Sequence, residues 1–249
     1  MGTIASAVKG SRPLKEEIEV IGCDEADGDC IESGIESDAF EAVLAQRRLQ
    51  LVMKRIMDVI GALVLISVFS PILLVTAVLV RFSSPGPIIF RQERRGYRER
   101  LFQFLKFRSM IVDQDRVMDN RKVKELQDNG ILVKVRRDPR VTAVGAFIRR
   151  TSIDELPQLI NVLMGDMSLV GPRPLVPYML EPFPKFQKVR CMVRPGLTGL
   201  WQIRDRERNT SAKYMVKHDL EYILRIGVLL DIWILLATLP ATILGKGAH

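Results

Sequence analysis

Cysteine and histidine are scarce in this sequence of 249 residues. Three cysteines are too few for a disulfide scaffold, and no two of them have the spacing of metal ligands. Two histidines are too few for a histidine metal site or for most catalytic triads. These absences exclude the disulfide-rich secreted class and most histidine-dependent enzymes, and they favour reduced thiols in a cytosolic compartment.

Acidic residues are few outside the beginning of the chain. Positions 1–50 hold eleven acids and five bases, whereas the rest holds 32 bases and 18 acids, a net charge of +14. This excess of positive charge after position 50 favours an anionic partner, such as a nucleic acid, an anionic lipid or a phosphorylated substrate. The acidic stretch mixes its acids with glycine and serine and has no sustained period. We therefore expect residues 1–42 to be a disordered leader.

One long run without charge extends from Val59 to Val80. As a helix, its 22 residues would extend about 33 Å, close to the bilayer's hydrocarbon thickness of roughly 30 Å. Bases lie on both sides of the run, which conflicts with the positive-inside rule for a single crossing. Ser70 and Pro71 lie at its middle, where a proline disrupts a helix. A re-entrant helix that breaks at Ser70-Pro71 and returns explains both flanks, and a spanning helix is the alternative.

The remaining segments predict an α/β (α+β) fold dominated by helices. Short apolar segments at 88–90, 101–108 and 131–135 predict short strands, and the uncharged stretch Ile232–Leu244 suits a core or interfacial amphipathic helix. The expected organisation has three parts: the leader 1–42, a basic amphipathic start with the membrane helix at 43–82, and a cytoplasmic domain at 83–249.

Two adjacent carboxylates, Asp154 and Glu155, precede an apolar helical pattern. The simplest interpretation is a capping box, in which Ser152 and Glu155 start the helix. Pro157 complicates this interpretation, because it would fall inside the first turns. The alternative is chemical: a carboxylate beside bases can attack phosphorus or hold a divalent cation on phosphate oxygens. Arginines on two Gly/Pro-rich loops, at 165–174 and 194–206, suit phosphate binding.

The order of several motifs along the chain resembles the bacterial sugar transferase family, the monotopic polyprenyl-phosphate hexose-1-phosphate (phosphoglycosyl) transferases in their short form. The resemblance covers roughly residues 48–245. It is carried by Lys54-Arg-x-x-Asp58, Phe69-Ser-Pro71, Lys106-Phe-Arg-Ser-Met110, Asp154-Glu-Leu-Pro-Gln-Leu159-x-Asn161, Gly165-Asp-Met-Ser-Leu-Val-Gly-Pro-Arg-Pro-Leu175, Arg194-Pro-Gly-Leu-Thr-Gly199 and Trp201-Gln202.

The resemblance implies an enzyme that transfers a sugar 1-phosphate from a UDP-sugar to undecaprenyl phosphate and releases UMP. The family's catalytic pair falls on Asp154 and Glu155: Asp154 would attack the β-phosphorus, and Glu155 would help to hold Mg²⁺ (or Mn²⁺) or assist proton transfer. The family's phosphate-binding residues fall on Lys106 and Arg173, and with them Arg149.

The resemblance also implies a re-entrant rather than a spanning helix, and membrane lipids as a further partner. It places the chain at the bacterial inner membrane, with the catalytic domain facing the cytoplasm. Glucose and galactose are the favoured sugars, and exopolysaccharide or another surface glycan is the expected product. Homodimer formation is left open.

The chain departs from the family pattern after Trp201-Gln202. Many members continue with a small residue, glycine and arginine, whereas Asp205 stands here in place of the glycine. Arg206 is the positional match for the family's arginine, but Arg204 or Arg208 could serve instead. The identity of the donor sugar therefore stays open.

Three other classes of protein are alternatives to a sugar-phosphate transferase. The sequence contains no aromatic-interleaved basic motif and no helix-turn-helix pattern, so we expect no nucleic-acid partner. A non-catalytic membrane scaffold would not need Asp154, Glu155, Lys106 and Arg173 together. An ordinary membrane-bound glycosyltransferase would release UDP instead of UMP.

Overall fold

The computed structural model describes residues 37–111, 140–177, 180–181, 183–204 and 212–243. Helices predominate, as expected, and the strands form two small sheets. The elements are α3 (Ser37–Gln46), α4 (Arg48–Ser83), β1 (Ile89–Arg95), β2 (Leu101–Phe107), α6 (Ala143–Arg150), α7 (Gln158–Met164), β3 (Ser168–Val170), α8 (Pro184–Arg190), β4 (Gly196–Thr198), α9 (Leu200–Arg204), α10 (Ala212–Arg225) and α11 (Val228–Ile243), with 3₁₀ turns at Tyr97–Glu99 and Ile153–Glu155.

Two sequence predictions fall at the edge of the described residues. Helix α3 begins at Ser37, inside the stretch 1–42 expected to be disordered, because Phe40 is buried in the main core. Residues 1–36 of that leader and the strand expected at 131–135 lie outside the described residues.

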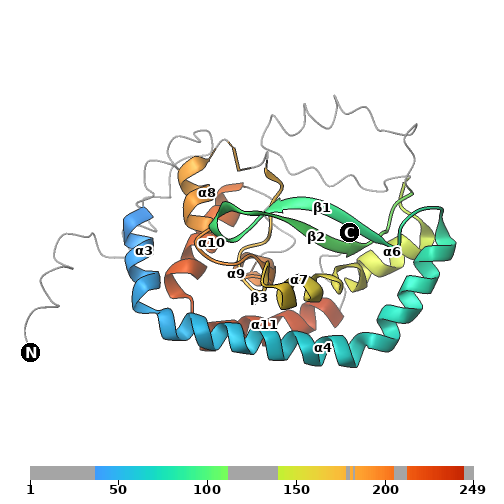
Figure 1. Cartoon of the computed structure of the whole chain (residues 1–249), viewed down its shortest axis with the longest axis horizontal. Coiled ribbons are helices and arrows are strands. Elements are labelled where there is room, and N and C mark those ends of the chain that lie inside the picture. Colours follow the sequence, from blue (N-terminus) through green and yellow to red (C-terminus); the bar gives the residue numbers. More distant parts are fainter. Residues whose placement is uncertain (1–36, 112–139, 178–179, 182, 205–211, 244–249) are drawn as a thin grey trace, which may run out of the picture.

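Helix α4 runs along one side of the molecule and then curves towards α6 (Figure 1). It has 36 residues and a mean hydropathy of 2.8 in its most apolar window, so by length and composition it could cross a membrane. The expected break at Ser70-Pro71 is wrong in one respect, because the helix continues through Pro71. A proline removes one backbone hydrogen bond, which bends a long helix without ending it. The re-entrant path through a bilayer stays a prediction.

Large apolar side chains on α4 are exposed over most of its length. Two other elements, α7 and α11, add exposed apolar residues of their own. An exposed apolar surface of this extent marks a site of association, and on a long apolar helix it favours contact with lipid. The residues include Leu63, Val64, Val68, Leu74, Val75 and Phe82 of α4, Ile160 and Met164 of α7, and Leu229, Trp233 and Leu236 of α11.

A buried polar cluster fastens α4 to the rest of the protein. Lys54 Nζ lies 2.5 Å from Asp231 Oδ2 of α11 and donates to the Val170 carbonyl of β3 at 2.8 Å. Asp58, one turn further along, accepts from the Leu169 backbone N–H at 2.9 Å. The Tyr222 hydroxyl of α10 donates to Asp231 Oδ1 at 2.8 Å. We call these four side chains the anchor cluster: Lys54, Asp58, Tyr222 and Asp231.

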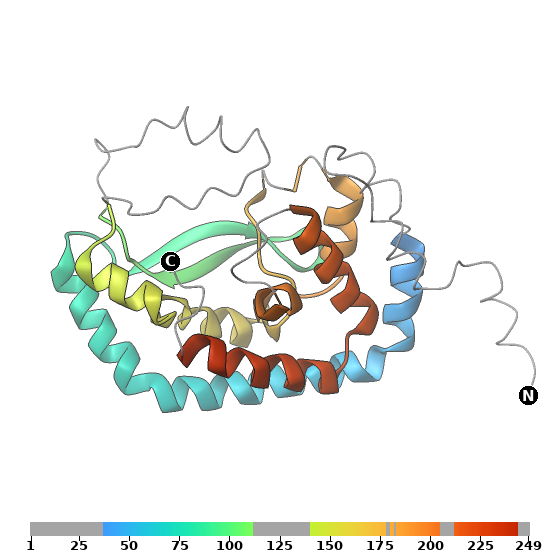
Figure 2. The ribbon, with the colours of Figure 1, turned by 180° about the vertical axis from the view of Figure 1, so that it is seen from behind.

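Strands β1 and β2 form an antiparallel hairpin that lies across the molecule above α7 (Figures 1 and 2). Its register pairs Ile89 with Phe107 and Arg95 with Leu101. Alternation buries Phe102 and Phe104 on one face, which confirms the strand expected from their spacing. The hairpin places Lys106 near its open end, next to the 3₁₀ turn at Ile153–Glu155.

Strands β3 and β4 are parallel and bring the two Gly/Pro-rich loops together. Close backbone packing requires glycine at the crossing, since a Cβ atom on Gly196 would lie 2.0 Å from the Gly171 nitrogen. Gly171 N–H donates to the Thr198 carbonyl at 2.9 Å, and Gly196 N–H donates to the Pro172 carbonyl at 2.8 Å. The two loops that the sequence presents separately are therefore one structural unit.

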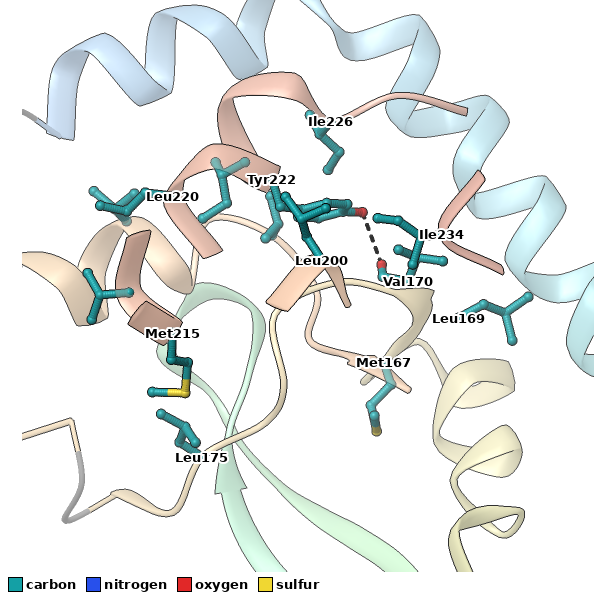
Figure 3. Packing of buried hydrophobic residues seen from close by; sticks show 14 of the residues in the cluster. Met167, Leu169, Val170, Leu175, Leu200, Met215, Leu220, Tyr222, Ile226 and Ile234 are labelled. Carbon is teal, nitrogen blue, oxygen red and sulfur yellow. Dashed lines mark hydrogen bonds between the residues drawn. The ribbon is translucent and has the colours of Figure 1, made fainter. Parts of the chain in front are cut away.

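The main core lies between α4, α7, α10 and the β3–β4 pair. Figure 3 shows Tyr222 reaching into it, with its hydroxyl 3.1 Å from the Val170 carbonyl. A second, smaller core is formed by Val80, Phe107 and Ile148, and it packs the end of α4 against α6 and the end of β2. Ile153, the residue before Asp154, is partly buried and packs against this smaller core.

Candidate active site

The backbone around Asp154 and Glu155 is a 3₁₀ turn and not the start of a capped helix. Ser152 has the left-handed conformation (φ 56°), and its side chain makes no capping hydrogen bond. Helix α7 begins later, with Pro157 in the capping position. The capping-box interpretation of Ser152 and Glu155 is therefore wrong. A non-glycine residue in the left-handed region is uncommon, and here it aims the turn towards β2.

Glu155 is held by two cations from different elements. Lys106 Nζ of β2 and Arg173 Nη2 of the turn after β3 each lie 2.9 Å from Glu155 Oε1. Burial alone would raise the pKa of Glu155, but Arg173 and Lys106 hold it well below its ordinary value. Glu155 in turn raises the pKa of Arg173. Glu155 therefore stays ionised at physiological pH.

Asp154 lies beside this cluster and is more deeply buried, with 6% of its surface exposed. Lys106 Nζ is 3.9 Å from Asp154 Oδ2, beyond hydrogen-bond distance. Burial, with a smaller contribution from Glu155, raises the pKa of Asp154 to about 6, although Lys106 and Arg149 act in the opposite direction. Two adjacent carboxylates thus have separated pKa values, a pattern typical of catalytic pairs.

Arg149 comes to the same place from the end of α6. That helix is capped by Thr142, whose side chain accepts from the Gly145 N–H at 2.8 Å. Arg149 Nε donates to Ser109 Oγ at 2.9 Å. Ser109 comes three residues after Lys106 in the chain. Its guanidinium is near enough to lower the pKa of Asp154. The structure therefore brings Arg149 together with Lys106, Arg173 and the two acids.

Arg206 and Arg208 belong to the stretch 205–211, which lies outside the described residues. Arg204 is the last residue of α9, and its Nη1 lies 2.6 Å from Glu221 Oε2 of α10. This ion pair occupies Arg204, so Arg206 and Arg208 stay the two expectations for a substrate contact.

Asn161 supports the site in a way that sequence reasoning did not assign. Its side-chain Oδ1 accepts from the Leu105 N–H at 3.1 Å, and its Nδ2 donates to the Gln103 carbonyl at 2.8 Å. Both partners belong to β2, so one amide fixes α7 against the strand that carries Lys106. The presence of Asn161 in the motif was a signal, but its bonds depend on tertiary structure.

The carboxylates of Asp154 and Glu155 are the kind of ligand that Mg²⁺ prefers. No group of three or more potential ligands occurs among the described histidine, cysteine, aspartate and glutamate residues. Mg²⁺ commonly binds one or two carboxylates and completes its shell with substrate phosphates and water. Both ion pairs of Glu155 with described residues fall on Oε1. Asp154 and Glu155 could therefore hold a metal that arrives with a diphosphate, whereas the described residues contain no site made by three such protein ligands.

Comparison with known protein families decides the class. The model of the family described as bacterial sugar transferase matches residues 49–245. The chain belongs to this family. The resemblance of the motif series is thereby confirmed, and the match covers the described residues from α4 to α11.

Three curated relatives illustrate the bacterial sugar transferases. The galactosyl transferase CpsE of Streptococcus agalactiae is 43% identical over 198 residues, which cover 80% of this chain and 44% of CpsE. The exopolysaccharide production protein ExoY of Sinorhizobium fredii is 38% identical over 208 residues, 79% of this chain and 88% of ExoY. The UDP-glucose:undecaprenyl-phosphate glucose-1-phosphate transferase of Caulobacter vibrioides is 39% identical over 204 residues, 79% of this chain and 72% of that protein. The enzyme class expected from the motifs agrees with the name of the Caulobacter protein.

Proposed function

We propose that this sugar transferase moves a sugar 1-phosphate from a UDP-sugar to undecaprenyl phosphate and releases UMP. The observation that carries the proposal is the arrangement of Glu155 between Lys106 and Arg173, with Asp154 buried beside them at a raised pKa. Cations grouped around two carboxylates suit a diphosphate, whose negative charge increases on the leaving phosphate as transfer proceeds. The names of the Caulobacter and Streptococcus relatives support glucose or galactose as the sugar.

The reaction proceeds in two displacements at Asp154. First, a carboxylate oxygen of Asp154 attacks the β-phosphorus of the donor, and the bond between this phosphorus and the bridging oxygen breaks, so UMP leaves with the electron pair. Then a phosphate oxygen of undecaprenyl phosphate attacks the same phosphorus, and the Asp154 carboxylate leaves. No net proton is consumed in either displacement. A covalent intermediate lets one site serve a soluble donor and a lipid acceptor in turn.

Asp154 and Glu155 have different roles in this proposal. A pKa of about 6 leaves Asp154 mostly ionised at neutral pH and more basic than an ordinary aspartate, which suits a nucleophile. Glu155, whose pKa is lowered, stays a carboxylate that orients Lys106 and Arg173 towards the diphosphate. Mg²⁺, held by Asp154, Glu155 and phosphate oxygens, would supply further neutralisation of the charge on the donor.

The membrane assignment rests on the exposed apolar surface of α4, α7 and α11. Met164 and Ile160 belong to the helix that follows Asp154, so lipid contact there would bring the reactive carboxylate close to the head groups. The bases on both flanks of the apolar run favour the cytoplasmic side of the bacterial inner membrane. An acceptor phosphate at the level of the head groups would then meet Asp154 without extraction of the lipid.

The nucleotide product tests the proposal. Detergent-solubilised protein is incubated with Mg²⁺, undecaprenyl phosphate and a panel of UDP-sugars, and UMP and UDP are separated by chromatography. We expect sustained, acceptor-dependent release of UMP from one sugar, and none from Asp154→Asn. Release of UDP would assign the protein to the ordinary glycosyltransferases, and absence of any product across the panel would favour a scaffold.

A further inference from the structure

Arg190, the last residue of α8, connects two parts of the protein that the chemistry does not use directly. Its Nε lies 2.8 Å from Asp219 Oδ2 of α10, and its Nη2 donates to the backbone carbonyl of Arg173. Arg190 is 5% exposed and Asp219 1% exposed, so neither can reach a substrate. One guanidinium thus binds a buried acid on one side and the phosphate-binding turn on the other.

The turn that carries Arg173 is held at several points along its backbone. Arg94 Nη1 of β1 donates to the Pro174 carbonyl at 3.3 Å, and the Pro172 carbonyl accepts from the Gly196 N–H at 2.8 Å. The contact from Arg190 falls on the peptide between Arg173 and Pro174, next to the side chain that binds Glu155. A change at this carbonyl would rotate the Arg173 side chain relative to Glu155.

We propose that Arg190 and Asp219 form a positioning pair that sets the direction of the Arg173 guanidinium towards the diphosphate of the donor. This inference rests on the proposed function, because it names the donor diphosphate as the group that Arg173 meets. Asp219 fixes the Arg190 guanidinium plane, and Arg190 fixes the Arg173 carbonyl. Arg190 and Asp219 are positioning residues and not catalytic residues.

Stability alone is a weak reason for such a pair. Replacing a buried ion pair by well-packed apolar residues is often neutral or stabilising, so a buried pair is poor evidence for a purely structural role. The forked geometry of Arg190 gives two bonds in fixed relative directions, which a lysine cannot reproduce. Orientation of the turn is the property that this geometry supplies.

The first test compares Arg190→Lys with wild type in steady-state UMP release at varied UDP-sugar concentration. Lysine can keep an ion pair with Asp219 but cannot bind Asp219 and the Arg173 carbonyl together. We expect kcat/KM for the donor to fall about 10- to 100-fold, since small displacements of a binding group have effects of this size. The control is Lys188→Met on the same helix, whose exposed pair with Glu41 (3.8 Å) does not touch the site, and it should leave kcat/KM unchanged.

Coupling to Arg173 separates positioning from general stability. In the Arg173→Ala background we expect Arg190→Lys to add less than about a twofold further loss, because the group it positions is gone. A full additional loss in that background would overturn the proposal, as would a wild-type kcat/KM in Arg190→Lys. Thermal unfolding is measured alongside, and Arg190→Lys should unfold close to wild type.

Binding of UDP to the protein with native Asp154, measured by calorimetry with Mg²⁺ and without acceptor, separates this inference from the proposed function. We expect UDP to bind and Arg190→Lys to weaken it about as much as Arg173→Ala does. If UDP binds and Arg190→Lys leaves its affinity unchanged, the positioning pair is refuted while the proposed function stands. If the protein with native Arg190 binds no UDP, the proposed function fails, and the inference fails with it.

Discussion

The anchor cluster and the active site each pair a lysine with carboxylates, yet they do different things. In the anchor cluster, Lys54 and Asp231 have side chains only 7% and 0% exposed. In the active site, Lys106 and Glu155 have side chains 23% and 17% exposed. The first lysine is enclosed by α4, β3 and α11, whereas the second lies at the open end of a hairpin. Access, and not composition, separates a structural ion pair from a reactive one.

The two clusters also differ in how their acids are satisfied. Asp231 receives Lys54 and the Tyr222 hydroxyl, and Asp58 receives a backbone N–H, so each buried acid has a partner. In the active site Glu155 receives both cations, whereas no described side chain donates a hydrogen bond to Asp154. An acid without a hydrogen-bond donor at its oxygens is available for chemistry, and one that is fully bonded is not.

The largest expected difference between the clusters is in activity. Asp154→Asn removes the proposed nucleophile, and we expect UMP release to fall about 10³-fold or more. Asp231→Asn, the matched change in the anchor cluster, should lower the yield of folded protein but leave kcat of the folded fraction within about threefold. Steady-state assays normalised to folded protein measure both. Equal losses of kcat in the two variants would show that the two clusters do not differ in their contribution to catalysis.

Stability should show the opposite order. Lys54→Met leaves Asp231 buried without its cation, and breaking a buried pair in this way costs about 3–5 kcal/mol. For a chain of this size the unfolding temperature should fall on the order of 10 °C. Thermal unfolding in detergent measures the shift. Lys188→Met loses only exposed contacts, with Glu41 and Ser37, so it serves as the control and should unfold like wild type. A Lys54→Met protein that also unfolds like wild type would contradict the anchor role.

A pH profile tests how Lys106 acts on Asp154. Protonated Asp154 cannot attack phosphorus, so activity should fall as the pH falls through its pKa of about 6. Lys106 lowers that pKa, and Lys106→Met should therefore move the acidic limb of the kcat/KM profile to higher pH. Arg149→Leu should move it in the same direction by less. A limb that stays in place in Lys106→Met would show that the lysine does not interact with the ionisation of Asp154.

The smallest expected effect is on the pH dependence of folding. The pKa of Asp154 is raised from 3.8 to about 6 on folding, so the folded state binds the extra proton between these values and stability falls as the pH rises through them. The Asp154→Asn variant lacks this loss of stability at higher pH. Its free energy of unfolding should match wild type below pH 4 and exceed it above pH 6 by at most about 3 kcal/mol. Denaturant titrations at both pH values measure the difference, which would be absent if Asp154 were not desolvated.

Local patterns predicted the elements that depend on neighbouring residues. The alternation of Phe102 and Phe104 gave the strand β2, and the apolar run gave α4. The segments along the chain also predicted a fold dominated by helices. The position of Asp154 next to Glu155 and the likeness of the surrounding motifs directed attention to the site, although spacing alone favoured a helix cap.

Contacts between distant segments could not be predicted in this way. Strands β3 and β4 have three residues each and lie far apart in sequence, so no periodicity marks them. Arg190 and Asp219 are 29 positions apart, and nothing local shows that they pair. Asp231 directly precedes the uncharged stretch Ile232–Leu244, and nothing local shows that its charge holds Lys54. In each case the decisive partner comes from another element.

The most direct test of the account is to find which acid becomes covalently modified. The protein is incubated with its UDP-sugar and Mg²⁺ without acceptor, quenched, digested and mapped by mass spectrometry. We predict that the peptide containing Asp154 gains the mass of one sugar phosphate, that this gain disappears on addition of undecaprenyl phosphate, and that the peptides containing Asp58 and Asp231 stay unmodified. Turnover without any adduct at Asp154, or an adduct on another acid, would contradict the account.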